Sequence, residues 1–378
     1  MSSLFQSQNN FDNPSQKNLL LSVLTDQISL TPARYSQILK FYESLSEAIE
    51  DNFEELKHLK LKWLDKIYPI IPDLNAKIQE LQASLDKNQI SLLSFDDPKY
   101  PQSLKILDNY PLVLYTQGNI DTLNDPMMVT VVGSRVIDPY TEIISQQILA
   151  PLCKLGIGIV SGLAIGMDGL AHQIALENKA KTVGVIGSGL DQKSFYPMQN
   201  WSLKNQILKT GGCVISEYTV GKLPNTYTFP QRNRLLAALT DLTFVVQASV
   251  KSGSLITALN ARDMGKTLAT TPADIRNKNF DGNLKLMKEG CQIITETADI
   301  ISLMGLKMHP EIQIQTTKQF GSKEEEKIYN LLTISPQNIE NLAIISKFDS
   351  TTISVALTML ELSSLAMNTG ENNWIKMG

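Results

Sequence analysis

Glycine, hydroxyl and arginine residues recur directly after short apolar segments in the middle of the chain, a combination suited to holding phosphates. The first such group is Gly133-Ser134-Arg135, which follows the apolar segment 127–132. Glycine lets a ligand approach the main chain, free N–H groups at a strand-to-helix turn attract anions, and a guanidinium can bind a phosphate through two hydrogen bonds. We interpret this group as a phosphate-binding turn; the alternative is a tight turn with a solvated arginine.

A second group, Ser161-Gly162, follows the apolar segment 157–160 and is succeeded by Asp168 and His172. The segment is rich in glycine but does not fit the dinucleotide pattern G-x-G-x-x-G. We expect Asp168 to cap the following helix and His172, four residues later, to lie on the same side within reach of it. For this pair a structural hydrogen bond is a better interpretation than catalysis.

A third group, Phe229-x-x-Arg232-Asn233-Arg234, stands at the start of an apolar run that extends to residue 239. Arginines around an amide at the start of a helix suit phosphates and base edges. The phenyl ring could stack on a base, an interaction worth roughly 1–3 kcal/mol per base. The alternative places the ring in the core and the arginines in ion pairs, and we expect that alternative to hold for one of the two arginines.

A fourth group, Lys251-Ser252-Gly253-Ser254, follows the apolar segment 242–246. Small hydroxyl residues and a glycine at a helix N-terminus suit an anion, and the lysine adds a positive charge. Serine is also a common helix cap, so the group is moderate support for phosphate binding.

Other chemistry has little support in the residues. Glu217 follows the segment 214–216 and leaves a hydrolase conceivable, but the P-loop pattern G-x-x-x-x-G-K-[ST] does not occur. Cys153, Cys213 and Cys291 form no C-x-x-C pair and the three histidines are scattered. We therefore expect buried, reduced thiols, no metal site and no cofactor.

The charges are unevenly distributed along the chain. The net charge is −4, yet residues 127–300 hold 17 Lys and Arg against 13 Asp and Glu, whereas both flanking segments are acidic. A locally basic groove on an acidic protein can still capture a polyanion. An excess of this size also falls within ordinary scatter, so charge does not decide the function.

A parallel sheet would bring these groups together. Near-continuous apolar segments alternate with helical patterns, at residues 127–132, 157–160, 183–186, 214–216, 242–246, 268–270 and 293–294. This alternation predicts an α/β fold, a parallel sheet covered by helices on both faces. In such sheets ligands bind outside the carboxyl ends of the strands, where the four groups lie.

Four segments are expected along the chain. Residues 1–88 form a helical module that begins with a polar arm, 1–16, and in which Thr31-Pro32 starts a helix. Residues 89–304 form the α/β domain, with a lead-in segment, 89–126, that contains a strand at 112–115. A polar linker, 305–320, follows. Residues 321–378 hold helices at 324–332, 339–345 and 351–362 and a strand pair at 365–367 and 374–377, which is a winged-helix pattern.

No signal peptide is expected, and no apolar run reaches the roughly 18 residues needed to span a bilayer. We therefore predict a soluble, cytoplasmic protein with no membrane partner.

The groups occur in an order that resembles the DNA-processing protein A family (DprA, also called Smf). The resemblance covers about residues 90–300 and includes Tyr196-Pro197, Ser216-Glu217-Tyr218 and Asp281-Gly282-Asn283-Leu284. It implies an extended Rossmann-like domain whose basic pocket binds single-stranded DNA, a SAM-like N-terminal module and a C-terminal winged-helix module. It also implies a homodimer that loads the RecA recombinase onto incoming DNA during natural transformation.

Carried over by residue, the resemblance assigns phosphate contacts to Gly133, Ser134 and Arg135. It places the following residues in the pocket: Phe229, Arg232, Asn233, Ser252, Gly253 and Ser254. Ser161, Gly162, Arg234 and Lys251 complete our set of candidate DNA-binding residues. The chain departs from the family pattern at Gln247, where glutamate is usual, and at Ala273, where glycine is expected.

Three functions are compatible with these residues. We expect a single-strand binder and recombination mediator that is not an enzyme. The alternative is a Rossmann-type hydrolase of nucleoside monophosphates, but the loop P-G-G-x-G-T-x-x-E of such proteins corresponds here to residues 252–258, which end without a glutamate. The third possibility is a regulatory or scaffold protein with a vestigial pocket.

Overall fold

The computed structural model describes residues 13–306, 320–363, 365–370 and 372–376. Contacts divide the chain into two compact units, Met1–Leu306 and Lys307–Gly378. The predicted linker lies almost entirely outside the described residues. In the described part of the chain no single helix is long and apolar enough to span a membrane, although the bent pair Ile339–Ser346 and Ser350–Leu362 passes that test by length and composition.

The first unit is built on a nine-stranded sheet with the order β1-β2-β6-β5-β4-β3-β7-β8-β9. The strands are β1 Ser91–Ser94, β2 Val113–Gly118, β3 Met128–Val132, β4 Gly158–Ser161, β5 Thr182–Ile186, β6 Cys213–Ser216, β7 Leu242–Val245, β8 Thr267–Thr270 and β9 Gln292–Ile293. Strands β3 to β9 pair in parallel, whereas β2 is antiparallel to β6 and β1 is antiparallel to β2. The predicted parallel sheet is confirmed; the short edge strand β1 was not predicted.

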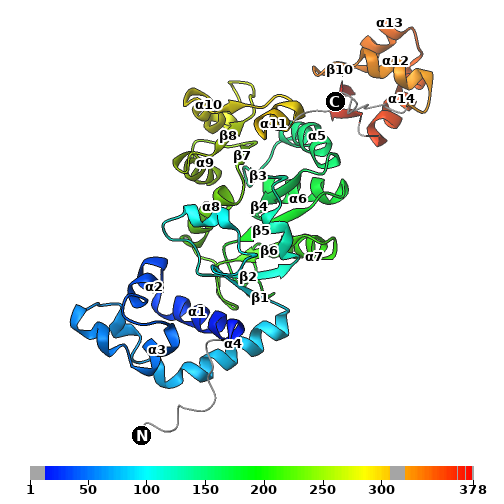
Figure 1. Ribbon diagram of the computed structural model, residues 1–378. Coiled ribbons are helices and arrows are strands. Elements are labelled where there is room, and N and C mark those ends of the chain that lie inside the picture. The colour runs from blue at the N-terminus through cyan, green and yellow to red at the C-terminus, as the bar shows by residue number, and fades with distance from the viewer. Residues whose placement is uncertain (1–12, 307–319, 364, 371, 377–378) are drawn as a thin grey trace. The chain divides into compact units, whose positions relative to one another are not determined.

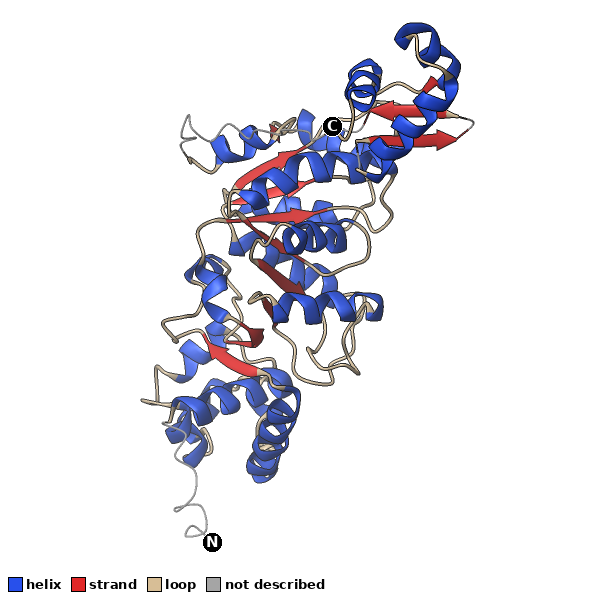
Figure 2. Cartoon of the chain, turned by 90° about the vertical axis from the view of Figure 1, so that its right-hand side faces the viewer, coloured by secondary structure: helices blue, strands red, loops and turns tan. Residues whose placement is uncertain are grey.

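Helices cover both faces of this sheet, which explains why its central strands are apolar on both sides. Helices α5, α6 and α7 lie on one face and α8, α9 and α10 on the other (Figure 1). Their bounds are α5 Pro139–Lys154, α6 Met167–Glu177, α7 Trp201–Lys209, α8 Thr228–Leu239, α9 Ser254–Asp263 and α10 Asp281–Lys288, and α11 Thr297–Leu303 packs beside α5. Figure 2 shows the strands crossing the middle of this unit with helices around them.

The N-terminal segment of the first unit is helical, as predicted. It comprises α1 Pro14–Ile28, α2 Pro32–Ile38, α3 Leu45–Glu50 and α4 Leu74–Asn88, with the short 3-10 helices η1 Glu54–Leu59, η2 Leu64–Lys66 and η3 Ile71–Asp73. Thr31 caps α2 by accepting from the Arg34 N–H, so the predicted helix start is confirmed. The predicted arm is wrong from residue 13 onward, because the Asn13 side chain caps α1 and proline occupies its first turn.

The second unit contains three helices and a three-stranded sheet. The elements are α12 Lys323–Leu331, α13 Ile339–Ser346, α14 Ser350–Leu362, β10 Gln337–Asn338, β11 Ala366–Gly370 and β12 Asn373–Lys376. Strand β12 pairs antiparallel with both β10 and β11, and Trp374 on β12 is buried against the helices. The predicted helices and strand pair are confirmed, while the assignment of this unit as a winged helix stays a prediction.

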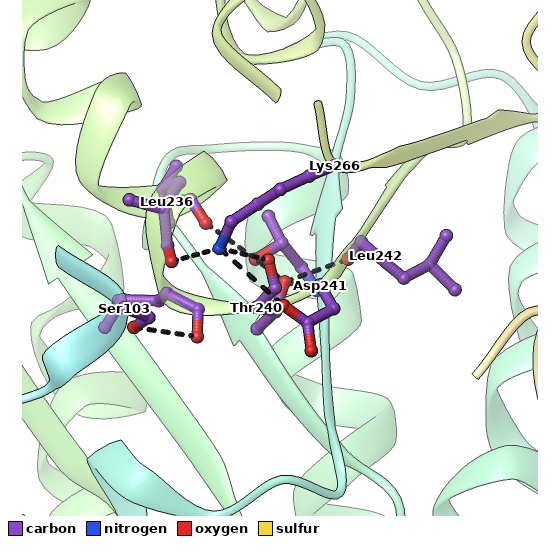
Figure 3. Close-up of polar contacts among 9 residues, drawn as sticks. Ser103, Leu236, Thr240, Asp241, Leu242 and Lys266 are labelled. Atoms are coloured by element: carbon purple, nitrogen blue, oxygen red, sulfur yellow. Dashed lines mark hydrogen bonds and ion pairs between the residues drawn. The ribbon is translucent and has the colours of Figure 1, made fainter. Parts of the chain in front are cut away.

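Lys266 holds the C-terminal end of α8, the helix that carries the third group of candidate residues. Its ammonium donates to the carbonyl oxygens of Ala238 and, at 2.9 Å, of Thr240 (Figure 3). On the other side of the same turn, the Thr130 hydroxyl donates to the Leu236 carbonyl at 2.8 Å. The last carbonyls of a helix have no partner within the helix, and a cation there also interacts favourably with the helix dipole. Lys266 therefore secures one end of α8.

We expect Lys266→Met to lower the free energy of unfolding by about 1–2 kcal/mol, because the carbonyls of the α8 end lose a charged donor. Urea unfolding followed by circular dichroism measures this change. The matched control is Lys285→Met, since Lys285 is exposed on α10 and reaches Glu289 only at 3.9 Å. Equal effects of the two variants would contradict the proposed anchoring role.

A candidate nucleic-acid binding site

A cavity of about 470 Å³ opens at the carboxyl ends of β3 and β7. The turn after β3, the start of α8 and the loop before α9 form its walls. The cavity brings together ten of the thirteen candidate residues: Gly133, Ser134, Arg135, Phe229, Arg232, Asn233, Lys251, Ser252, Gly253 and Ser254. Segments that are more than 100 residues apart thus meet at one edge of the sheet, as parallel strand order requires.

The turn after β3 is fixed by its own hydrogen bonds. The Ser134 carbonyl accepts from the Met167 N–H at 3.0 Å, and the Ser134 hydroxyl accepts from the Val136 N–H at 3.2 Å. The Arg135 side chain is exposed, and its guanidinium lies over the Phe229 ring, 5.3 Å from the ring centre. The turn therefore presents a fixed main chain and a guanidinium supported by an aromatic face.

The loop before α9 supplies hydroxyl groups and the second exposed cation. The Ser252 and Ser254 hydroxyls are 2.7 Å apart, and the Asn233 amide donates to the Gly253 carbonyl at 3.2 Å. This last bond joins the start of α8 to the start of α9. Lys251 is exposed, and in the described part of the chain neither it nor Arg135 has an ion-pair partner. Both charges are therefore available to an anion.

Arg232 is bound to main-chain carbonyls of the protein and is therefore not a free phosphate ligand. Its side chain is buried, and it donates to the carbonyls of Gly162, at 2.6 Å, and Val185. A Cβ at residue 162 would collide with this guanidinium and with Asp168, so glycine is needed for the close approach. Burial lowers the pKa of Arg232, and the negative charge of Asp168 opposes that shift. Arg232 thus places a held positive charge beneath the cavity.

The expected pairing of Asp168 with His172 is wrong. Asp168 lies in the first turn of α6 but faces back toward the loop, where the Gly162 and Ala164 N–H groups stabilise its charge. The His172 Nδ1 lies 2.7 Å from the Thr182 hydroxyl on β5. His172 is on the sheet side of α6, where it is completely buried, so the four-residue spacing did not produce a contact.

This burial makes the stability of the protein depend on pH. Burial lowers the pKa of His172 to about 3, whereas the unfolded chain protonates near the ordinary value of 6.5. Between these values the unfolded state binds the extra proton, so stability falls as the pH falls. We expect the titration of His172 to lower the free energy of unfolding by about 2 kcal/mol between pH 7 and pH 5. Urea unfolding of the wild type and of His172→Gln at both pH values measures this change. An identical pH dependence in the variant would exclude His172 as its cause.

Three candidate residues do not line the cavity. The Ser161 hydroxyl is buried and donates to the Val131 carbonyl at 2.6 Å, so it holds two strands together. Gly162 lines a smaller adjoining hollow. Arg234 points to the other side of α8 and forms an ion pair with Glu217. The ion-pair alternative therefore holds for Arg234.

The departures from the family pattern also lie outside the cavity. Gln247 is buried at the end of β7, where its amide oxygen accepts from the Thr141 hydroxyl at 2.8 Å. Ala273 follows β8 and lines neither the cavity nor the adjoining hollow. Neither departure removes a group that faces the site.

Comparison with known proteins places the chain in a family. The model of the family "DNA recombination-mediator protein A" matches residues 91–305, more than half of the chain. The chain belongs to this family. The DNA processing protein DprA of Bacillus subtilis is 30% identical over 268 residues, which cover 71% of this chain and 85% of that protein. The protein Smf of Escherichia coli is 32% identical over 225 residues; the match covers 60% of this chain and 59% of Smf.

Two solved structures of family members resemble the fold. The X-ray structure of DNA processing protein A from Streptococcus pneumoniae aligns with a TM-score of 0.61 and 30% identity, covering 78% of this chain and 97% of that chain. DNA processing protein A from Helicobacter pylori aligns with a TM-score of 0.51 and 32% identity, covering 57% of this chain and 94% of that chain. The Helicobacter pylori structure was described for its unique single-stranded DNA binding mode.

The cavity also contains nine residues that were not among the candidate DNA-binding residues. They are mostly chain neighbours of the candidates: Val132, Ala164, Asp168, Thr226, Pro230, Leu236, Ser249, Ile256 and Thr257. Thr226 precedes α8 and Ser249 follows β7, so both occupy positions at a strand end or helix start. Both belong to loops at the carboxyl ends of strands, where ligands bind in such sheets, and this position is the signal that marks them in the sequence.

Proposed function

We propose that this protein binds single-stranded DNA in the cavity and acts as a recombination mediator without catalysing a reaction. One observation carries the proposal. Arg135 and Lys251, exposed cations without an ion-pair partner among the described residues, line a cavity that also holds serine hydroxyls and the Phe229 ring. Cations neutralise phosphates, and an aromatic face can stack on any base. The single-stranded DNA binding mode described for the Helicobacter pylori relative supports the same substrate.

This arrangement favours binding that is insensitive to base sequence. The cavity wall offers hydroxyls, main-chain groups and the buried Arg232 charge, all of which suit phosphate oxygens. Most of the binding free energy would then come from charge neutralisation, so affinity falls as salt rises. A recombination mediator needs binding that is insensitive to base sequence because it must accept any incoming strand.

The downstream partner in this proposal is the RecA recombinase. Membership of the family supports a role in which a homodimer protects incoming DNA and loads RecA onto it during natural transformation in the cytoplasm. The resemblance to DNA processing proteins over residues 91–305 is the basis for this step.

A nucleotide hydrolase is the alternative, and the cavity offers it little. Asp168 is the only carboxylate among the described lining residues, and it is buried beside the Arg232 charge. Glu217 lies outside the cavity in its ion pair with Arg234. A general base must lie within hydrogen-bond reach of the reacting water, whereas Asp168 faces the Gly162 and Ala164 N–H groups and the Arg232 charge. We therefore propose a binding function rather than hydrolysis.

Fluorescence anisotropy with labelled single- and double-stranded oligonucleotides across a salt series tests the proposal. We expect tight single-strand binding that weakens with salt and much weaker duplex binding. A strand-exchange assay with RecA on DNA coated by a single-strand-binding protein tests the mediator step. Absence of oligonucleotide binding, together with release of base or phosphate from a nucleoside monophosphate, would replace this proposal with the hydrolase.

A further inference from the structure

A small hollow of about 30 Å³ adjoins the cavity on the side of β5. It shares Arg135, Ala164, Phe229 and Arg232 with the cavity, so the two are continuous. The rest of its lining consists of glycine, aliphatic and aromatic residues: Gly162, Ile165, Gly187, Tyr196 and Pro197. The hollow is too small to enclose a nucleobase, but it ends on the exposed side chains of Tyr196 and Ile165. A flat apolar ligand would therefore lie over it rather than in it.

Tyr196 extends the aromatic surface of the site beyond Phe229. The two ring centres are 5.7 Å apart with the planes tilted by 58°, and Arg135 lies against Phe229. Tyr196 is 44% exposed. At Gly187 a Cβ would lie 3.3 Å from the Phe229 ring and 3.1 Å from the Thr228 carbonyl, so glycine permits the close packing of α8 against the β5 end.

The loop that carries Tyr196 is rigidly supported. Its neighbour Phe195 is buried with its ring 5.2 Å from that of Trp201. The buried Lys204 donates to the Leu190 carbonyl at 2.5 Å, and the Asp191 carboxylate accepts from the Gly221 N–H at 2.7 Å. An exposed ring on such a loop loses little conformational freedom when a ligand stacks on it.

We propose that Tyr196 is a stacking platform for an unpaired base, next to the position where Arg135 binds a phosphate. This inference rests on the proposed function and specifies how the site selects single strands. Bases in a duplex are stacked and paired inside the helix and cannot lie flat on a protein ring, whereas bases of a single strand can. The polar cavity holds the backbone and the Tyr196 ring holds a base. Selection for single strands then follows from the aromatic side of the site.

The test measures the affinity of full-length wild-type protein and of full-length Tyr196→Ala for a normal single-stranded oligonucleotide and for a fully abasic strand of the same length. We expect Tyr196→Ala to weaken binding of the normal strand roughly 5- to 150-fold, the range typical of one stacked base. The abasic strand should bind the wild type and the variant almost equally. Tyr196→Phe keeps the ring and should keep the affinity.

Tyr227→Ala is the matched control, because Tyr227 is 76% exposed but lines neither the cavity nor the hollow. Circular dichroism confirms that each variant is folded. If Tyr196→Ala retains normal affinity while Arg135→Ala loses it, the platform is wrong and the proposed function stands. If the wild type binds neither strand, the proposed function fails first. If both strands lose affinity equally in Tyr196→Ala, the ring supports the loop and does not stack on a base.

Discussion

Replacing Arg135 by alanine will weaken single-strand binding roughly ten- to hundredfold at low salt, because a charge-assisted phosphate contact is lost. Arg135 is the exposed guanidinium at the turn after β3, and no acidic side chain in the described residues forms an ion pair with it. Its removal also takes away the group that lies over Phe229. Both effects act on the bound strand, so Arg135→Ala should weaken binding more than removal of the other exposed cation of the cavity, Lys251.

The salt dependence of DNA binding distinguishes the loss of a phosphate contact in Arg135→Ala from a change in the shape of the cavity. For single strands the slope of log affinity against log salt changes by about 0.7 for each phosphate contact, so Arg135→Ala should have a shallower slope by about that amount. Arg262→Ala is the matched control: it removes the same charge from the last turn of α9, at the far end of that helix from the cavity. Equal losses in the two variants would show that total charge, and not this turn, governs binding.

Replacing Arg232 by methionine will lower the free energy of unfolding by about 3–5 kcal/mol, the usual cost of leaving one partner of a buried charge pair alone. The guanidinium is buried, donates to the carbonyls of Gly162 and Val185, and balances the charge of Asp168. Methionine fills similar space but supplies none of these interactions. Urea unfolding followed by circular dichroism measures the loss.

The pH dependence of the stability of Arg232→Met shows whether the unpaired Asp168 charge causes the destabilisation. Burial raises the pKa of Asp168, and the Arg232 charge opposes this shift. Without Arg232 the pKa of Asp168 rises further, so the folded state binds a proton there that the unfolded state does not, and the contribution of Asp168 to stability increases as the pH falls. Arg232→Met should therefore be less destabilised at pH 5 than at pH 7, and adding Asp168→Asn should recover part of the loss. A deficit that is independent of pH and of Asp168 would point to packing.

The local signals in the sequence were sufficient for the elements that build the site. Short apolar segments that alternate with helical patterns predicted β3 to β9, and Thr31-Pro32 predicted the start of α2. These signals are local, because an apolar run and a helix cap can both be recognised within one short segment. The edge strand β1, Ser91–Ser94, carried no such signal, since it is short and only partly buried.

The sequence by itself determined that the candidate groups meet, because carboxyl ends of parallel strands lie at one edge of a sheet. Only the tertiary structure decided which side chains face the cavity. Arg232 and Arg234 are two residues apart on α8, so they point to nearly opposite sides, one beneath the cavity and the other toward Glu217. The sequence specifies this angle but not the rotation of α8 against the sheet, which depends on packing between distant segments. For the same reason Tyr196 meets Phe229 only in the folded chain.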